Sequence, residues 1–223
     1  MHKIGAITVG QSPRDDIVPD MKRILGESFE IIECGALDGL SPREIQLLAP
    51  GDDDHIVVSR RRDGSAVTLA KKHVSHRLQR CIDQLEKRNV KLIALLGTAN
   101  FPELKSTKLL IQPSNLLQRM AISMIEKGRI SVVTPLKKQC EQTRRKWEHL
   151  RVDVVVDHAL PYASEDQIIA VAQRIVKENV DLIVLDCIGF NVTMKRSIRM
   201  IVKKPILLPI TLLARIIAEL VTS

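Results

Sequence analysis

The amino-acid sequence predicts an α/β fold built from two similar halves with parallel sheets. Apolar runs of strand length alternate with longer segments of helical periodicity along the chain, which is the pattern of parallel sheets covered by helices. Residues 91–100 and 181–190 each hold an unbroken apolar run, as expected of a strand buried on both faces. The chain also repeats itself, because residues 3–9 resemble residues 129–135 and residues 91–100 resemble residues 181–190.

Composition narrows the class of protein and of partner. The chain has 223 residues, of which 45% are hydrophobic and 27% charged, as in ordinary globular proteins. The net charge of +8 favours anionic partners, but aromatic residues make up only 2%, so platforms for stacking bases are scarce and nucleic acid is not expected. No apolar run reaches the roughly 20 residues that span a bilayer, and the first residues show no signal peptide. We expect a cytoplasmic protein without a membrane partner, and a homo-oligomer stays open.

In the first half, the predicted elements begin at recognisable signals. Ser12 and Pro13 are typical of the N-cap and the first position of a helix. Ser41 and Glu44 form a capping box, and the Asp-Gly pair at residues 63–64 predicts a hairpin at the sheet edge. The expected elements are strand 3–9, a helix from residue 13, strand 29–36, a short helix from residue 42, hairpin strands 56–59 and 66–69, helix 73–87, and a strand with its loop over residues 91–100.

The second half shows the same alternation. Ser164 and Gln167 form another capping box. The expected elements are a helix after residue 114, strand 129–134, a basic helix to about residue 150, strand 152–156, a helix from residue 165, a strand with its loop over residues 181–190, a short basic helix, strand 205–208, and a closing helix that buries Leu213, Ile216, Ile217 and Leu220. We expect residues 1–113 with 208–223 to form the first half and residues 114–207 the second.

The cysteines and histidines predict no structural metal and no crosslinks. The chain has four widely spaced cysteines without a CxxC pair: Cys34, Cys81, Cys140 and Cys187. We therefore expect neither a zinc site nor a disulfide framework. Cys81 falls on the apolar face of helix 73–87 and is expected in the core. His73 and His76 have no carboxylate or third histidine at a matching spacing, so they are expected to be solvated.

Cys187 follows an apolar run at the point where a buried strand ends. Ligands of open α/β sheets bind outside the carboxyl ends of the strands, so a thiol there is a candidate for chemistry. The alternative is a structural cysteine, because free cysteines are among the most buried residues. Position alone leaves both interpretations open.

The loop after the first strand is a second candidate region. Free N–H groups at a helix start bind carboxylates, which makes Gln11, Ser12 and Arg14 candidate substrate-binding residues. Helix capping and surface charge explain the same residues, and Asp15 and Asp16 lie beside them. Both interpretations stay open here too.

Short motifs, taken in order, make the sequence resemble the AroM family over nearly its whole length. These motifs are Gly10–Arg14, Val58–Arg61, Thr98–Asn100, Gln112–Ser114, Lys146–Trp147 and Leu185–Phe190. More distantly, the chain resembles the aspartate/glutamate/hydantoin racemase superfamily. That resemblance implies two Rossmann-like (flavodoxin-like) halves with an active-site cleft between them.

The superfamily places one cysteine at a strand end of each half, and the two thiols exchange protons on opposite faces of a carbon next to a carboxylate. In this chain Cys187 matches the second-half cysteine, whereas Gly97 and Thr98 stand at the first-half position. In this respect the chain resembles the arylmalonate decarboxylases of the superfamily, which have Gly-Thr in the first half and a single cysteine in the second. The resemblance therefore favours chemistry with one thiol.

Such chemistry passes through an enediolate-like transition state, which preorganised donors stabilise. The resemblance implies Cys187 and Thr98 as catalytic residues. The expected substrate-binding residues are Gln11, Ser12, Arg14, Gly97, Ala99, Asn100, Thr134, Ile188 and Gly189. Taken one by one, Thr98, Asn100 and Thr134 are more simply explained by helix capping or by bonds within their loops, and only their joint position at strand ends, opposite a thiol, favours a site. No cofactor and no metal are implied, and the expected ligand is a small carboxylate or another small anion.

Two classes of function therefore stay open. The first is a cofactor-independent isomerase or decarboxylase in which Cys187 moves a proton on one face of the substrate. The second is a non-catalytic or regulatory module that binds a small anion. A fast-alkylating thiol that a dicarboxylate protects favours the enzyme, whereas an inert thiol with intact anion binding favours the module.

Overall fold

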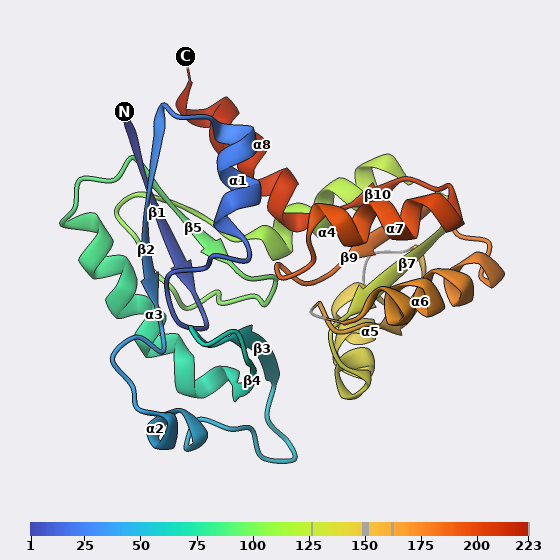
Figure 1. The fold of residues 1–223 in the computed structure, drawn as a ribbon, viewed down its shortest axis with the longest axis horizontal. Helices are drawn as coiled ribbons and strands as arrows, with labels where there is room; N and C mark the ends of the chain where they lie inside the picture. Colours follow the sequence, from blue (N-terminus) through green and yellow to red (C-terminus); the bar gives the residue numbers. More distant parts are fainter. Residues whose placement is uncertain (126, 149–151, 162, 223) are drawn as a thin grey trace. The chain divides into compact units, whose positions relative to one another are not determined.

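The structure is a computed structural model that describes residues 1–125, 127–148, 152–161 and 163–222. The chain divides into two compact units, unit 1 formed by Met1–Pro113 with Leu213–Ser223, and unit 2 formed by Ser114–Leu212. The division falls inside the last helix, α8 (Pro209–Val221). Each unit contains a four-stranded sheet (Figure 1) whose strand pairs are all parallel. The predicted α/β class with two similar halves is confirmed.

The sheet of unit 1 has the strand order β2-β1-β5-β6. Its strands are β1 (His2–Thr8), β2 (Phe29–Gly35), β5 (Leu92–Leu96) and β6 (Leu109–Ile111). The central strand β5 is buried along its whole length, as its apolar run predicts. Strand β6 was not predicted, because three residues at a sheet edge are too few to show a periodic pattern.

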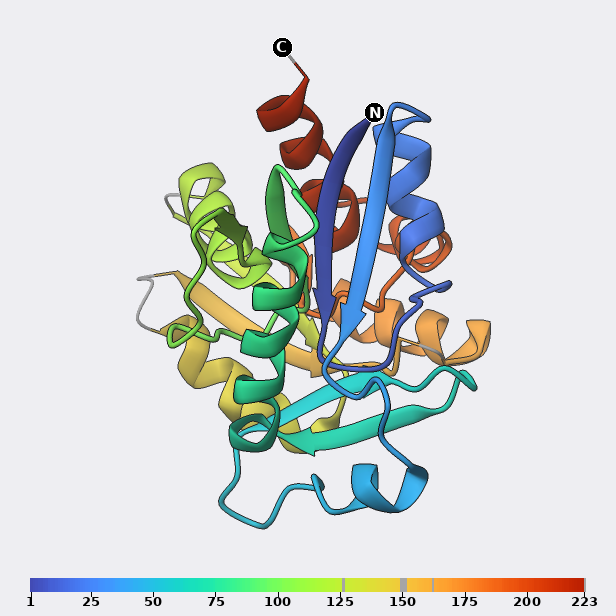
Figure 2. The same ribbon diagram turned by 90° about the vertical axis from the view of Figure 1, so that its left-hand side faces the viewer.

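The helices of unit 1 are α1 (Val18–Leu25), α2 (Pro42–Gln46) and α3 (Lys71–Glu86). Two of them, α1 and α3, cover the faces of this sheet, while α2 lies apart from it (Figure 1). Helix α3 lies on one face, while α1 and the end of α8 lie on the other (Figure 1 and Figure 2). The buried residues of α3 recur at helical spacing, as predicted: Val74, Leu78, Cys81, Ile82 and Leu85.

The predicted hairpin forms, but not at the sheet edge. Strands β3 (Ile56–Arg60) and β4 (Ala66–Ala70) pair with each other in a separate two-stranded sheet. Gly64 in its turn has φ of +87°, a conformation that glycine adopts without strain. The end of the hairpin contacts the segment after α2 instead of the sheet, because the Ala70 N–H donates to the Leu48 carbonyl at 2.9 Å. The expectation of an edge position was wrong.

The expectation that no disulfide forms was also wrong. Cys34 on β2 and Cys81 on α3 are joined by a disulfide, with their Cα atoms 5.5 Å apart. Cys81 is buried in the core of unit 1, as the helical pattern predicted. Because 47 residues separate the two cysteines, only the packing of α3 against β2 brings them together, and their spacing in the sequence could not reveal the bond.

The sheet of unit 2 repeats the topology of unit 1. Its strand order is β10-β9-β7-β8, which is the order of unit 1 with each strand replaced by its counterpart in the repeat. The strands are β7 (Arg129–Thr134), β8 (Asp153–His158), β9 (Leu182–Leu185) and β10 (Ile206–Leu207). The internal repeat in the sequence thus corresponds to a repeated structural unit.

The helices of unit 2 follow the predicted alternation. They are α4 (Pro113–Met124), a short 3-10 turn (Lys137–Gln139), α5 (Cys140–Glu148), α6 (Glu165–Lys177) and α7 (Val192–Val202). Leu117 of α4 and Trp147 of α5 share a core with strands β7 and β9. The predicted end of α5 near residue 150 lies outside the described residues.

Helix α8 departs from its prediction at one position. Leu213 and Ile217 are fully buried, as expected, and Ile216 is half-buried. Leu220, expected in the core, is 54% exposed, whereas Val221 beside it is 8% exposed, so the last turn of the helix turns Val221 and not Leu220 towards the protein.

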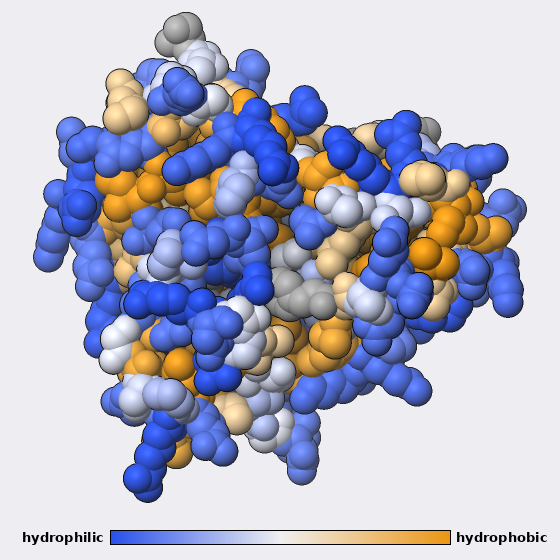
Figure 3. Space-filling model, viewed as in Figure 1, coloured by the Kyte–Doolittle hydropathy of each residue, from blue (hydrophilic) through white to orange (hydrophobic). Residues whose placement is uncertain are grey.

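The surface is mainly hydrophilic on the face shown in Figure 3, where apolar patches lie between charged side chains. Among the described residues, no helix combines the length and apolar character needed to cross a membrane. Within the same part of the chain, no group of three or more His, Cys, Asp or Glu side chains is arranged to hold a metal ion.

Candidate functional site

In both sheets the chain reverses its winding direction between the two central strands. In unit 1 it passes from β1 outward to β2 and then returns to β5 on the other side of β1, and unit 2 does the same with β7, β8 and β9. The carboxyl ends of strands beside such a switch point are where open α/β sheets bind ligands. The candidate site residues therefore lie after β1 and β5 in one unit and after β7 and β9 in the other.

In unit 2, Cys187 lies in the turn that follows β9. The Cys187 N–H donates to the Leu185 carbonyl at 2.8 Å, and the Phe190 N–H donates to the Cys187 carbonyl at 3.3 Å. Ile188 and Gly189 complete this turn, and helix α7 begins at Val192. The cysteine is 7% exposed and forms no disulfide. A cysteine outside any disulfide is thus held at the switch point by the backbone of its own turn.

Thr134 ends the neighbouring strand beside this turn. The pairing of Val133 with Leu185 and a 2.8 Å hydrogen bond from the Asp186 N–H to the Val133 carbonyl put Thr134 next to Asp186. The Thr134 hydroxyl is buried and contacts the hydroxyl of Thr143 on α5 at 3.1 Å. Within unit 2 the structure therefore brings together two predicted site positions, Thr134 and the Cys187 turn.

The side chain of Asp186 is buried within unit 2 and is bound by two donors. Its carboxylate accepts hydrogen bonds from Lys146 Nζ, at 2.8 and 3.0 Å, and from Trp147 Nε1, at 3.1 Å. The side chain of Asp186 is only 4% exposed, and that of Lys146 is 24% exposed. Both donors lie on α5. Sequence reasoning did not assign these three residues to the site, although all three fall in the motifs that resemble the AroM family.

In unit 1, the loop after β5 holds Gly97, Thr98, Ala99 and Asn100. Gly97 is buried, Thr98 and Ala99 are half-buried, and Asn100 is exposed. The loop ends at Phe101, which is fully buried.

The side chain of Gln112 closes this loop. Its Oε1 accepts from the Phe101 N–H at 2.9 Å, and its Nε2 donates to the Phe101 carbonyl at 3.1 Å. Gln112 thereby fixes the end of the loop that carries Thr98. It was also missed as a site residue, although it stands in a family-like motif.

The registers of the two sheets make Gly97 and Cys187 equivalent. Thr8 and Thr134 are the last residues of β1 and β7, and each carbonyl accepts from an alanine N–H after the neighbouring edge strand, at 2.8 and 2.9 Å. Thr8 pairs with Leu96, and Thr134 lies one residue beyond the pair of Val133 with Leu185. Leu96 thus corresponds to Asp186. The next residues, Gly97 and Cys187, therefore correspond to each other as well.

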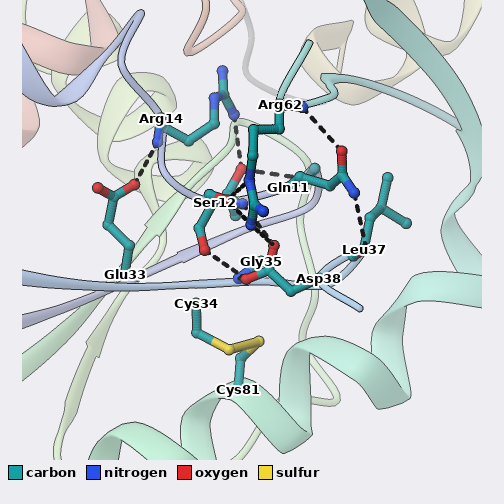
Figure 4. Close-up of polar contacts among 12 residues, drawn as sticks. Gln11, Ser12, Arg14, Glu33, Cys34, Gly35, Leu37, Asp38, Arg62 and Cys81 are labelled. Atoms are coloured by element: carbon teal, nitrogen blue, oxygen red, sulfur yellow. Dashed lines mark hydrogen bonds and ion pairs between the residues drawn. A yellow bond between two sulfur atoms is a disulfide. The ribbon is translucent and has the colours of Figure 1, made fainter. Parts of the chain in front are cut away.

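The loop after β1 does not open a helix, so the expected helix start at Ser12 was wrong. The Ser12–Pro13 peptide bond is cis, and α1 starts only at Val18. Ser12 is instead bound by Asp38, which accepts from the Ser12 N–H at 2.8 Å and from its hydroxyl at 2.5 Å (Figure 4). Side-chain bonds to the backbone compete with helix formation in this way.

Gln11 and Arg62 fasten the same loop from the hairpin side (Figure 4). The Gln11 Oε1 accepts from the Arg62 N–H at 2.9 Å, and the Arg62 guanidinium donates to the Ser12 carbonyl at 2.6 and 2.8 Å. A Cβ at Gly35 would lie within 2.8 Å of Gly10, Ser12 and Asp38 atoms, so only glycine permits this close approach. Gln11 and Ser12, predicted as substrate contacts, therefore also hold the loop together.

Arg14 is 2% exposed, and its side chain is hydrogen-bonded within unit 1. Its guanidinium donates to Asp16 through Nε at 2.8 Å and Nη2 at 2.9 Å, and to the Thr8 hydroxyl through Nη1 at 2.7 Å. The Arg14 N–H donates to Glu33 at 2.7 Å. Arg14 thus links the end of β1 to the loop, and its predicted contact with a substrate stays a prediction.

A pocket of about 390 Å³ lies beside this loop in unit 1. Its lining combines apolar side chains with two arginines: Gln11, Leu40, Pro42, Ile45, Arg61, Arg62 and Asp63. Its arginines give this side of the loop a positive charge that suits a small anion.

Removing the carboxylate of Asp38 is expected to loosen the loop. In the Asp38→Ala variant the N–H groups of Ser12 and Gly35, which now donate to Asp38 at 2.8 Å each, lose their acceptor. We expect a loss of about 2 kcal/mol in the free energy of unfolding, measured by urea denaturation. The matched Asp53→Ala variant removes an exposed carboxylate and should change the value by about 0.5 kcal/mol or less. Equal losses in the two variants would show that Asp38 does not anchor the loop.

Asp16 should make the stability of the protein depend on acid pH. Burial opposes its ionisation, but the hydrogen bond and the charge of Arg14, with a weaker contribution from Arg60, outweigh burial and lower the pKa of Asp16. Its stabilisation is therefore complete above its usual pKa of about 4 and is lost as the pH falls through the lower folded value.

The Asp16→Asn variant is expected to lose less stability than the wild type as the pH is lowered from about 6 to about 2.5, followed by urea denaturation at each pH. Burial raises the pKa of Glu33, so Glu33 acts with the opposite sign, but it is present in both proteins and cancels in the comparison. Parallel stability curves for the two proteins would contradict the role of Asp16.

Solved structures that resemble this chain share its fold at low sequence identity. Maleate isomerase Iso from Pseudomonas putida S16 has a TM-score of 0.65 and 13% identity, covering 99% of this chain and 93% of that chain. A glutamate racemase isoform from Bacillus anthracis has a TM-score of 0.63 and 14% identity, covering 98% and 81%. An arylmalonate decarboxylase has a TM-score of 0.60 and 13% identity, covering 97% and 92%. The resemblance to the fold of the racemase superfamily is confirmed.

Among curated protein sequences, none matches this chain significantly. The family model described as AroM protein matches residues 4–221, which is nearly the whole sequence and includes every motif that suggested this family. The chain therefore belongs to the AroM protein family.

Proposed function

We propose that this protein is a cofactor-independent enzyme that moves a proton at the carbon next to a carboxylate, with Cys187 as the acid or base. The observation that supports it best is the register equivalence of Cys187 and Gly97 at the switch points of two matching sheets. A single thiol then serves one face of the substrate. The protein would therefore be an isomerase or a decarboxylase rather than a racemase with two thiols.

In the isomerase form of the reaction, the Cys187 thiolate takes the proton from the carbon and an enediolate forms. The thiol then returns that proton to the far carbon of a neighbouring double bond in the substrate, so that the double bond shifts; returning it to the same carbon on the same face would only restore the substrate. In the decarboxylase form, a malonate-type substrate loses CO₂, the resulting enediolate takes the thiol proton, and the thiolate recovers a proton from water. Both forms place a negative charge on carboxylate oxygens, which fixed donors stabilise.

The donors that we propose for this charge are the Thr98 hydroxyl and the backbone N–H groups of Thr98 and Ala99. Asn100 and Thr134 are further candidates. Solvent access supports the assignment of the first loop, because Thr98 and Ala99 are half-buried and Asn100 is exposed. The proposal requires one bound substrate to meet this loop and the Cys187 turn, as the resemblance to the racemase superfamily implies.

Deuterium exchange tests this proposal without knowledge of the natural substrate. The protein is incubated in D₂O with aspartate, glutamate and an arylmalonate, compounds that structural neighbours are named for, and proton NMR follows the carbon next to the carboxylate. We expect enzyme-dependent deuterium incorporation or CO₂ loss with at least one compound. Binding in a calorimeter without exchange or turnover of any of them would support the anion-binding module instead.

A further inference from the structure

Two motifs that lie 40 residues apart meet at the turn that carries Cys187. Lys146 Nζ lies 2.8 and 3.0 Å from the two carboxylate oxygens of Asp186, and Trp147 Nε1 lies 3.1 Å from one of them. All three residues belong to unit 2. Asp186 is also the residue directly before Cys187 in the chain.

A buried carboxylate is costly unless charge and hydrogen bonds compensate it. The side chain of Asp186 is 4% exposed, and these contacts bind both of its oxygens. Trp147 is fully buried in the core of unit 2, so its N–H is held in a fixed position. The arrangement therefore restrains Asp186 and, through the backbone, the turn that begins there.

We propose that Lys146 and Trp147 are positioning residues for Cys187: they clamp Asp186 in place, and Lys146 cancels a negative charge that would otherwise oppose thiolate formation. This inference rests on the proposed function, because it assigns the clamp to a thiol that works as an acid and base. It adds to that function an explanation of how Cys187 can ionise although an acidic residue, Asp186, directly precedes it.

Other charged groups lie on the elements around the Cys187 turn. Helix α7, which follows the turn, carries Lys195 and Arg196, and α5 also carries Arg144 and Arg145. The neighbouring strand end contributes Thr134, which is uncharged. None of these groups changes in the variants below, so their effect on the thiol is the same in every protein compared.

The pH dependence of Cys187 alkylation tests the clamp. In a Cys140→Ser background Cys187 is the one cysteine outside a disulfide, because Cys34 and Cys81 are bonded to each other. The rate of iodoacetamide alkylation is measured by mass spectrometry from about pH 5 to about pH 10, for this parent and for three variants: Lys146→Met, Asp186→Asn and the double variant. Circular dichroism confirms that each one is folded, and Lys146→Arg keeps the charge as the conservative control.

The two single variants should shift the alkylation midpoint in opposite directions. Lys146→Met exposes the thiol to an uncompensated carboxylate and moves the midpoint up by about half a pH unit or more, whereas Asp186→Asn leaves the lysine charge and moves it down by a similar amount. The double variant should return close to the parent, and Lys146→Arg should match it. A merely structural role would lower the rate in both single variants without opposite shifts.

The outcomes separate the clamp from the proposed function. If the parent thiol reacts with a clear midpoint but no variant moves it, or both single variants move it the same way, the clamp is overturned and the proposed function stands. If the parent thiol stays unreactive throughout the pH range until the protein is unfolded, the acid–base role of Cys187 fails, and the clamp fails with it.

Discussion

The Cys187→Ala variant is expected to lose deuterium exchange and turnover by about a thousandfold or more, because the proposed reaction then has no acid or base on the reacting face. Its fold should remain, since replacing a small buried side chain by alanine costs about 1 kcal/mol. The measurement is the rate of solvent deuterium incorporation at saturating substrate, together with a thermal melt of each protein.

The other free cysteine supplies the matched control. Cys140 lies at the start of α5 and is half-buried, and burial raises the pKa of its thiol, so it is poorly suited to proton transfer at neutral pH. Cys140→Ala should keep the full rate. Undiminished exchange in Cys187→Ala, with the rate lost in Cys140→Ala or in neither variant, would remove Cys187 from the mechanism.

The second large effect is expected from a gain of chemistry in the Gly97→Cys variant. Gly97 occupies the position that corresponds to Cys187, and the atoms nearest to a Cβ there would be those of the Leu95 side chain, at 3.6 Å or more, which is ordinary contact. The variant should therefore fold. Under the proposed function, a thiol at this position would add an acid or base on the second face of the substrate, so the variant should racemise a product of single handedness that the wild type leaves unchanged.

Chiral chromatography of an enantiopure product incubated with each protein measures this gain. The Gly97→Ala variant adds a Cβ without a thiol and should not racemise the product. We expect racemisation at a rate at least about ten times that of the wild type. A folded Gly97→Cys variant that still depends on Cys187 for turnover but racemises no faster than Gly97→Ala would contradict the proposed equivalence of the two positions.

Much of the fold could be predicted because it follows from local patterns. The apolar runs that became β5 and β9 and the spacing of buried residues on α3 are visible in the sequence itself. The repeat gave the two similar halves. Three features escaped for physical reasons: the three-residue strand β6, the disulfide between Cys34 and Cys81, and the separate position of the β3–β4 hairpin. Each depends on tertiary packing between segments distant in the chain.

The candidate site was predicted in part for the same reason. The strand-end positions of Cys187, Thr134 and the Gly97–Asn100 loop follow from the order of the elements. The start of α1 did not, because Asp38 binds both the N–H and the hydroxyl of Ser12, the expected cap, and nothing near Ser12 in the sequence indicates a partner 26 residues away. Lys146 and Asp186 meet only in the folded unit, so sequence reasoning had no reason to join them.

The handedness of a product formed in D₂O tests the central claim most directly. A prochiral, disubstituted malonate is incubated with the wild-type protein, and the product of the proposed decarboxylation is analysed by chiral chromatography and mass spectrometry. A single thiol that delivers the proton to one face predicts one deuterium at the new stereocentre and one enantiomer. A racemic product, or the same product from Cys187→Ala at the same rate, would contradict the account.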